Sequence, residues 1–228
     1  MARYYPISLN VEGRRCLIVG GGRVAERKVN TLIEARADLY LVAREVTPGI
    51  EALAESGALH VRIGEPVEDD LEGAVLVIAA TDDEALNRQL REWAGARSIL
   101  INVVDVPELC DFIVPARINR GPIAITISTG GSSPALSKHL RRVIEEHVTE
   151  AHGGLAELMG RLRDEVFGSI HTQPSRAAAW QRVIDSDVID LLAAGEHGEA
   201  ERLARQIIGL DERPRDKEAP DVPDPEAS

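Results

Sequence analysis

Aromatic residues are scarce in this chain: they make up 3% of its 228 residues, whereas hydrophobic residues as a whole make up 44%. A buried core must therefore be built mainly from Val, Ile, Leu and Ala. Long apolar runs are also lacking, since no segment approaches the roughly 20 consecutive apolar residues of a membrane-spanning helix. No signal-peptide run follows residues 1–6. We therefore expect no membrane association and a cytoplasmic location.

Cysteine and positive charge are in short supply as well. The two cysteines, Cys16 and Cys110, each lie beside a predicted strand, and we interpret them as buried reduced thiols. No Cys or His spacing suggests a metal site. The formal net charge of −12 argues against general nucleic-acid binding, which needs a basic surface. It leaves an anionic small substrate open, because local charge can oppose the global balance.

The first 105 residues alternate between apolar strand-like and amphipathic helix-like segments. We predict strands over 15–19, 39–43, 59–63, 75–80 and 98–104, and helices over 24–35, 50–56 and 83–96. In the first helix, Val24, Val29, Leu32 and Ile33 are expected to form the buried stripe. Repeated strand–helix units with nearly continuous apolar strands are typical of a parallel sheet covered on both faces.

The pattern changes after Asp105. Strands are predicted over 112–117 and 123–129, joined by a turn at residues 119–122. Ser133 is a plausible N-cap and Pro134 a plausible first residue of a helix that runs to about residue 150. Three further helices are expected over 155–166, 176–194 and 196–208. The acidic, proline-containing tail has the composition of a disordered segment.

These patterns predict an α/β fold: a Rossmann-type parallel sheet, then a small α+β region, then a helical carboxyl-terminal domain. The predicted domains are 1–111, 112–150 and 151–210, followed by the tail 211–228.

A glycine turn follows the first strand and opens the first helix. Gly20, Gly22 and Ala25 have the G-x-G-x-x-A spacing of the dinucleotide fingerprint. Gly20 permits the tight turn, Gly22 lets a pyrophosphate approach the backbone, and Ala25 allows close packing of helix and strand. The helix N-terminus offers unpaired N–H groups to the phosphates. A simple strand-to-helix turn is the alternative, but the flanking elements favour a bound dinucleotide.

The end of the second strand lacks the acidic residue that usually holds the adenine ribose. Residues 42–45 read Val-Ala-Arg-Glu. Glu45 comes one or two positions late, and Arg44 could accept a 2′-phosphate. We predict NAD as the cofactor in preference to NADP, although no single residue of this segment distinguishes the two.

Acidic groups also follow the fourth and fifth strands, at the sheet edge where doubly wound proteins bind ligands. Asp82 and Asp83 are interpreted as caps of the following helix. Asp105 ends an otherwise apolar strand and is interpreted in two ways, as a turn or cap residue before Pro107 or as a general acid/base. Partial burial would raise its pKa toward the working range.

A long stretch without acids lies in this acidic protein. No Asp or Glu occurs between Phe112 and Arg142, although the chain has 38 of them. The basic side chains of the stretch are Arg117, Arg120, Lys138, His139, Arg141 and Arg142. Its middle is the Ser/Thr/Gly loop 128–133, whose N–H and hydroxyl groups suit anions. We favour a surface for a polycarboxylate or polyphosphate; a basic helix face with a flexible loop is the alternative.

Four motifs in order carry a family resemblance: residues 16–28 around the glycine turn, residues 79–83, the Asn-Val-Val-Asp motif 102–105 and the loop 128–134. They resemble precorrin-2 dehydrogenase, the dehydrogenase/ferrochelatase module of sirohaem synthases. The resemblance runs from about Tyr4 to Val148 and continues more loosely through the helices. No uroporphyrinogen methyltransferase domain follows, so we expect the stand-alone form.

The resemblance implies a homodimeric enzyme that oxidises precorrin-2 to sirohydrochlorin with NAD, and some members also insert ferrous iron into the product. It implies that 112–150 serves dimerisation and substrate binding. Asp105 would be the acid/base. The implied cofactor residues are Gly20, Gly22, Arg23, Val24, Arg44, Glu45 and Thr81. The candidate substrate residues come from the stretch without acids and its Ser/Thr/Gly loop, and they are Arg117, Arg120, Ser128, Thr129, Gly130, Lys138, His139 and Arg141. Some relatives carry a phosphorylatable serine where Thr129 stands.

Two other classes of protein are alternatives to this enzyme. A non-catalytic module that senses NAD or a tetrapyrrole would keep the glycine turn but has no need of Asp105. A short-chain dehydrogenase is disfavoured, because Tyr4, Tyr5 and Tyr40 form no Tyr-x-x-x-Lys pair. Iron would be a substrate and no resident metal is expected, since the six histidines are dispersed.

Overall fold

The computed structural model describes residues 4–211. The chain divides into two compact units after Val114. The predicted disorder of the tail concerns residues that, apart from Asp211, lie outside the described range.

The amino-terminal unit is built on a five-stranded sheet. Its strands are β1 (Arg15–Val19), β2 (Asp38–Ala43), β3 (His60–Ile63), β4 (Leu76–Ala79) and β5 (Leu100–Val103). They lie in the order β3-β2-β1-β4-β5, and every pairing is parallel. The order reverses between β1 and β4, so the crevice at the carboxyl ends of these two strands is the expected ligand site. The predicted Rossmann-type α/β fold is confirmed.

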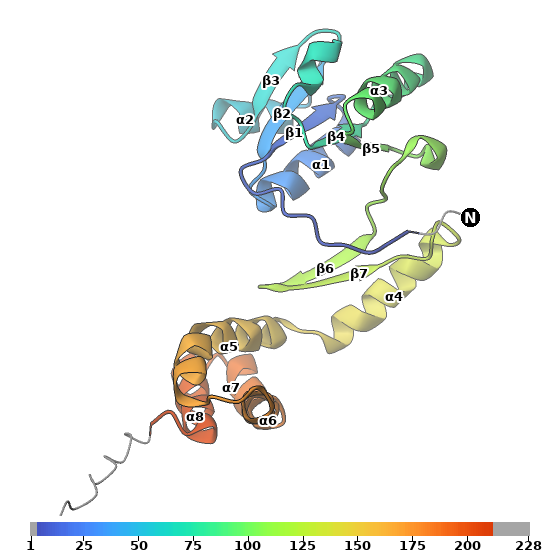
Figure 1. Ribbon diagram of the computed structural model, residues 1–228. Coiled ribbons are helices and arrows are strands. Elements are labelled where there is room, and N and C mark those ends of the chain that lie inside the picture. The colour runs from blue at the N-terminus through green and yellow to red at the C-terminus, as the bar shows by residue number, and fades with distance from the viewer. Residues whose placement is uncertain (1–3, 212–228) are drawn as a thin grey trace, which may run out of the picture. The chain divides into compact units, whose positions relative to one another are not determined.

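Helices cover both faces of this sheet (Figure 1). The helices α1 (Arg23–Glu34) and α2 (Pro48–Glu55) pack on one face, and α3 (Glu84–Ala96) packs on the other. Two short 3₁₀ helices, η1 (Glu68–Leu71) and η2 (Pro107–Leu109), complete the unit. Consecutive residues of β1 alternate between two cores, as a strand buried on both faces requires.

The buried stripe of α1 differs from the prediction at its first position, and the predicted Ile33 is only partly buried. Ala25, Val29 and Leu32 are buried, whereas Val24 is 38% exposed. Residues 25, 29 and 32 are spaced by four and three, which places them on one helix face, while a spacing of five separates residue 24 from residue 29. Val24 is therefore accessible at the helix start.

The second unit begins with a β-hairpin and one helix. The antiparallel strands are β6 (Ala116–Arg120) and β7 (Ile123–Ile127), so the strand predicted over 112–117 exists but begins and ends later in the chain. Pro115 has no N–H for a ladder, and the Phe112 carbonyl accepts from the Asn102 amide at 2.9 Å. The helix α4 (Pro134–His147) starts as predicted, with the Ser133 hydroxyl accepting from the Leu136 N–H at 3.1 Å.

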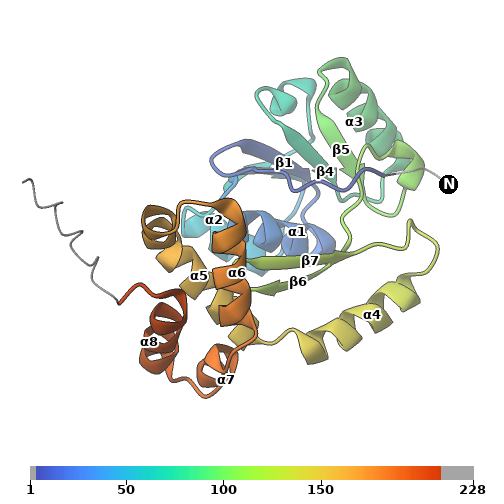
Figure 2. The same ribbon diagram turned by 60° about the horizontal axis from the view of Figure 1, so that its bottom comes forward.

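Four more helices form a separate apolar core (Figure 2). They are α5 (Glu150–Ser169), α6 (Gln173–Ile184), α7 (Val188–Ala193) and α8 (His197–Ile208). The helix predicted over 176–194 is therefore two helices. The Ser186 hydroxyl donates to the Val183 carbonyl at 2.7 Å and accepts from the Val188 N–H at 3.4 Å, which ends α6 and begins α7.

Within residues 4–211, no helix is long and apolar enough to cross a membrane. The predicted domain boundaries and cytoplasmic location stay predictions.

Candidate functional site

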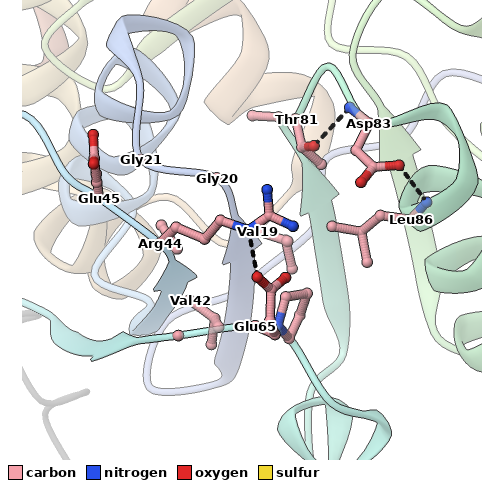
Figure 3. Close-up of a pocket in the computed structure, with 14 residues that line it drawn as sticks. Val19, Gly20, Gly21, Val42, Arg44, Glu45, Glu65, Thr81, Asp83 and Leu86 are labelled. Atoms are coloured by element: carbon pink, nitrogen blue, oxygen red, sulfur yellow. Dashed lines mark hydrogen bonds and ion pairs between the residues drawn. The ribbon is translucent and has the colours of Figure 1, made fainter.

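A cavity of about 210 Å³ opens at the carboxyl ends of β1, β2 and β4, where the strand order reverses (Figure 3). Four of the predicted cofactor residues, Gly20, Arg44, Glu45 and Thr81, line it. The remaining lining residues are Val19, Gly21, Val42, Ala43, Gly64, Glu65, Pro66, Ala80, Asp83 and Leu86. The cavity is therefore in the place that the strand-end argument predicted.

The three glycines of the turn have different structural roles. Gly20 has a φ of +116°, and a Cβ there would lie 2.2 Å from the Ala80 carbonyl oxygen. A Cβ on Gly21 would lie 1.9 Å from the Glu45 carbonyl oxygen. Both positions therefore exclude any side chain. The fingerprint treats the middle residue as free, so the requirement at Gly21 was missed.

Gly22 faces open space instead. Nothing lies within 4 Å of a Cβ built on it, and it caps α1 without a side-chain hydrogen bond. The first N–H groups of a helix have no partner within the helix. Arg23 and Val24 are exposed beside them and do not line the cavity. An open backbone with free donors fits the phosphates of a dinucleotide.

The end of β2 presents Arg44 and Glu45 in different directions (Figure 3). Arg44 extends over the cavity, and its Nε donates to the carboxylate of Glu65. Figure 3 shows the Glu45 side chain directed away from this pair. Glu65 follows β3, which is the neighbour of β2 in the sheet. Glu65 was not predicted, because the fingerprint places the ribose-binding acid at the end of β2 and Glu65 follows β3.

The end of β4 is ordered by short hydrogen bonds. The Asp83 carboxylate accepts from the Leu86 N–H at 3.0 Å and caps α3, as predicted. The Thr81 hydroxyl accepts from the Asp83 N–H at 3.0 Å, and the buried Asn87 amide donates to the Thr81 carbonyl at 3.0 Å. Asp82 is exposed and is not the cap.

Asp105 lies in a turn just beyond β5, with a φ of +61°. This left-handed conformation is uncommon outside glycine, although Asp tolerates it better than most residues. The cap of η2 is Val106, so Asp105 is not a cap. The expected partial burial is wrong, because Asp105 is exposed at the tip of the turn. Asp105 also does not line the cavity.

The loop after Asp105 is tied back to β5 by polar side chains. The Cys110 thiol accepts from the Val103 N–H at 3.2 Å and donates to the Val103 carbonyl at 3.1 Å. The Asp111 carboxylate accepts from the Ile101 N–H at 3.1 Å. Desolvation by burial raises the pKa of the Cys110 thiol, so it stays protonated and able to donate. These contacts hold the turn that carries Asp105.

Lys28 of α1 is electrostatically coupled to this turn. Its half-buried position lowers the pKa of its amine, and the charge of Arg27 lowers it further, while the carboxylate of Asp105 opposes both. Asp105 is therefore one of the charges that act on the Lys28 amine. Lys28 is the last residue of the motif 16–28 around the glycine turn, but no role was predicted for it from the sequence.

The predicted substrate residues of the second unit fall into three groups. On the hairpin, Arg117 and Arg120 are half-buried, and Arg120 donates to the Val148 carbonyl at 3.1 Å and contacts Glu150 at 3.3 Å. In the loop, the Ser128 hydroxyl accepts from the Gly130 N–H at 3.2 Å, and Thr129 accepts from the Ser133 N–H at 3.2 Å.

The third group lies on α4. Lys138, His139 and Arg141 are exposed, and Arg141 pairs with Glu145 one turn along at 2.9 Å. An exposed pair of this kind contributes little to stability and can be exchanged for another anion. The structure thus leaves the α4 cations accessible, whereas Arg120 is already partnered.

The apolar face of α4 is also accessible. Leu136 is 47% exposed, and Leu140 and Val143 are each 37% exposed. Their spacing of four and three places them on one side of the helix. Within residues 115–148 only Ile118 and Ile127 are buried. This segment therefore has almost no core of its own.

In the part of the chain that the structure describes, no group of three or more His, Cys, Asp or Glu side chains could hold a metal ion. The parallel sheet, the glycine turn and the open start of α1 define the amino-terminal unit as a Rossmann-type dinucleotide-binding domain.

Comparisons with known families agree with this class and extend it. Residues 7–116 match a family described as NAD(P)-binding, residues 120–147 match the central region of sirohaem biosynthesis proteins, and residues 151–208 match the sirohaem synthase dimerisation region. The dimerisation match lies on α5–α8, beyond the segment to which the sequence assigned dimerisation.

Individual relatives with a similar sequence are also proteins of sirohaem biosynthesis. The siroheme synthase of Pseudomonas entomophila (strain L48) is 40% identical over 90% of this chain and 44% of its own length. That of Thioalkalivibrio sulfidiphilus (strain HL-EbGR7) is 41% identical over 92% and 43%. The chain thus spans less than half of these relatives. Two of the three family models that match it describe proteins of sirohaem biosynthesis, and the chain is similar to siroheme synthases over about nine tenths of its own length.

The fold has a solved counterpart as well. SirC, a precorrin-2 dehydrogenase, superposes with a TM-score of 0.73 at 24% identity, over 90% of this chain and 99% of that chain. This likeness supports the fold of the described residues.

Proposed function

We propose that this protein oxidises precorrin-2 to sirohydrochlorin with NAD. The observation that carries the proposal is the cavity at the β1–β4 crevice, beside a helix N-terminus left open at Gly22, in a chain similar to siroheme synthases. The substrate loses a hydride and a proton, and the products are sirohydrochlorin, NADH and H⁺. The similarity to siroheme synthases and the fold shared with SirC, a precorrin-2 dehydrogenase, make precorrin-2 the favoured substrate.

In this proposal the amino-terminal domain, residues 1–111, holds the cofactor. Gly20 and Gly22 shape the turn, the exposed N–H groups at Arg23 and Val24 receive the pyrophosphate, and Arg44, Glu45 and Thr81 border the ribose and nicotinamide ends. The nicotinamide ring supplies a hydride acceptor when NAD is bound.

Asp105 is proposed to accept the substrate proton. Its exposed carboxylate stands at the strand-end edge, on a turn held by Cys110 and Asp111. The charge of this carboxylate acts on the Lys28 amine, where it opposes the lowering of the Lys28 pKa by burial and by Arg27. A module that only sensed NAD or a tetrapyrrole would not require an acid at this turn.

Residues 112–150 are proposed to bind the substrate. The acid-free stretch removes repulsion toward the substrate carboxylates, and Lys138, His139 and Arg141 offer exposed positive or hydrogen-bonding groups. We assign supporting roles to Arg117, Ser128, Thr129 and Gly130, and a structural one to Arg120 because it is already partnered.

A homodimer is proposed as the working form. The exposed apolar face of α4 and the nearly coreless hairpin would gain a core from a second copy, since a two-stranded hairpin alone is marginally stable. The helical domain, residues 151–210, matches the family's dimerisation region and is a second candidate contact.

The test is anaerobic addition of precorrin-2 to the purified protein with NAD. The proposal predicts stoichiometric NADH formation, followed by a metallated product spectrum if ferrous iron is also accepted as substrate. NAD binding without NADH formation would favour the sensing module instead. A heat-denatured sample controls for spontaneous oxidation of the substrate.

A further inference from the structure

A carboxylate stands at the cavity where the second strand supplies none. Glu65 follows β3 by two residues and lines the cavity together with Arg44 and Glu45. Because β3 pairs with β2 in parallel, the ends of both strands reach the same edge of the sheet. The structure thus brings Glu65 beside the end of β2.

Arg44 is engaged by this carboxylate. The Arg44 Nε donates to Glu65 Oε1, and this hydrogen bond raises the pKa of the guanidinium above its usual value. Asp83, on the other side of the cavity, also acts on Arg44 electrostatically. Two acids therefore lie around the cation that would otherwise suit a phosphate.

The acid at the end of the second strand normally binds the ribose 2′-hydroxyl of NAD, whereas an arginine nearby accommodates the 2′-phosphate of NADP. Here both groups are present and paired with each other. We infer that Glu65 sets the preference of this site for NAD over NADP. It supplies the carboxylate that β2 lacks and keeps Arg44 from a 2′-phosphate. The inference rests on the proposed dinucleotide site.

The charges explain the direction of the preference. A 2′-phosphate would have to displace Glu65 from Arg44 and then remain close to a carboxylate of the same sign. A 2′-hydroxyl can instead donate to Glu65 while Arg44 stays paired. Because both side chains are largely exposed, salt will weaken the effect.

The test is isothermal titration of the full chain with NAD and with NADP at low salt. We expect the wild type to bind NAD more tightly. Glu65→Gln removes the charge while keeping the shape of the side chain. It should shift the ratio of the two dissociation constants toward NADP by about tenfold or more, as expected for losing one charged hydrogen bond.

Two further variants make the result specific. Glu65→Gln combined with Arg44→Ala should lose most of the gain in NADP affinity, because the freed guanidinium is what receives the phosphate. Glu12→Gln is the matched control, since Glu12 pairs with Arg36 on the surface of the same domain and does not line the cavity. It should leave the ratio unchanged.

The outcomes separate the inference from the proposed function. Binding of both nucleotides with an unchanged ratio in Glu65→Gln would overturn the role of Glu65 and leave the dinucleotide site standing. Failure of the wild type to bind either nucleotide would overturn the site and the inference together. Circular dichroism of each variant confirms that the fold is retained.

Discussion

The amino-terminal unit and the segment 115–148 differ sharply in how much they bury. The sheet of the first unit has apolar cores on both faces, with β1 and β4 buried along nearly their whole length. The segment 115–148, with its hairpin and α4, buries only Ile118 and Ile127. The first unit has a closed core on each face of its sheet, whereas the second segment leaves the apolar face of α4 exposed.

This difference indicates that the two regions are suited to different tasks, namely holding a cofactor rigidly and contacting other molecules. A closely packed domain can fix the backbone of the glycine turn and hold a cofactor in one place. A segment with an exposed apolar helix face and accessible cations is suited to contact a second subunit and an anionic substrate. The following predictions test each side of this comparison, in order of decreasing effect.

Gly21→Ala should damage the packed unit most. Its methyl group would overlap the Glu45 carbonyl, and overpacking of this kind costs about 3 kcal/mol or more. We expect a much lower urea midpoint and no measurable NAD binding. Gly22→Ala is the comparison, since it meets no atoms. It should cost about 1 kcal/mol as a poorer helix cap and still weaken NAD binding. Equal stability of the two variants would contradict the assigned roles.

Leu140→Asp tests the open segment. A charge in the centre of the α4 apolar face should raise the dimer dissociation constant by about 100-fold, because a central apolar contact contributes several kcal/mol. Light scattering would report the mass of a monomer at micromolar concentration. Lys138→Asp lies on the opposite side of α4 and should keep the dimer mass. An unchanged mass for Leu140→Asp would assign dimerisation to other residues.

Arg141→Glu tests the same segment as a substrate surface. Reversal of one accessible charge should weaken binding of the polycarboxylate substrate by about tenfold, as expected for the loss of one charged contact. NAD affinity should stay unchanged. Arg202→Glu is the control, since Arg202 is also exposed and paired along its own helix, with Glu199. Equal losses for substrate and NAD would refute the acid-free stretch as a substrate surface.

Cys110→Ala should have the smallest effect. It leaves the Val103 N–H without the thiol acceptor, at a cost of about 1 kcal/mol, and loosens the turn that carries Asp105. We expect kcat to fall several-fold while NAD affinity is retained. Cys110→Ser, which keeps a donor and an acceptor, should recover part of the loss. A fall in stability without any fall in kcat would show that Cys110 supports the fold alone.

The sequence predicted the sheet, the glycine turn and the cap at Ser133 because each depends on neighbouring residues. Glu65 could not be found in this way, since its place beside Arg44 arises from strand pairing across the sheet. The clash that demands glycine at position 21 involves a carbonyl 24 positions away. The break between α6 and α7 was not predicted, because the sequence does not show that the Ser186 hydroxyl will form hydrogen bonds with the backbone and end the helix.

The exposure of Asp105 to solvent could not be predicted from the sequence either. An apolar strand that ends in an acid indicates where the carboxylate emerges, but the depth of the turn depends on how residues 106–111 fold back. The resemblance to the family motif suggested the proposed role of Asp105, while the structure supplied its conformation.

The most direct test of the central claim is anaerobic single-turnover reduction of NAD by precorrin-2 with wild type, Asp105→Ala and Asp82→Ala. Loss of a general acid/base typically slows a reaction by about 100-fold or more. We therefore predict that Asp105→Ala binds NAD with wild-type affinity but forms NADH at least that much more slowly. Asp82→Ala, which alters an exposed acid at the neighbouring strand end, should react at the wild-type rate. Wild-type NADH formation by Asp105→Ala would contradict the account.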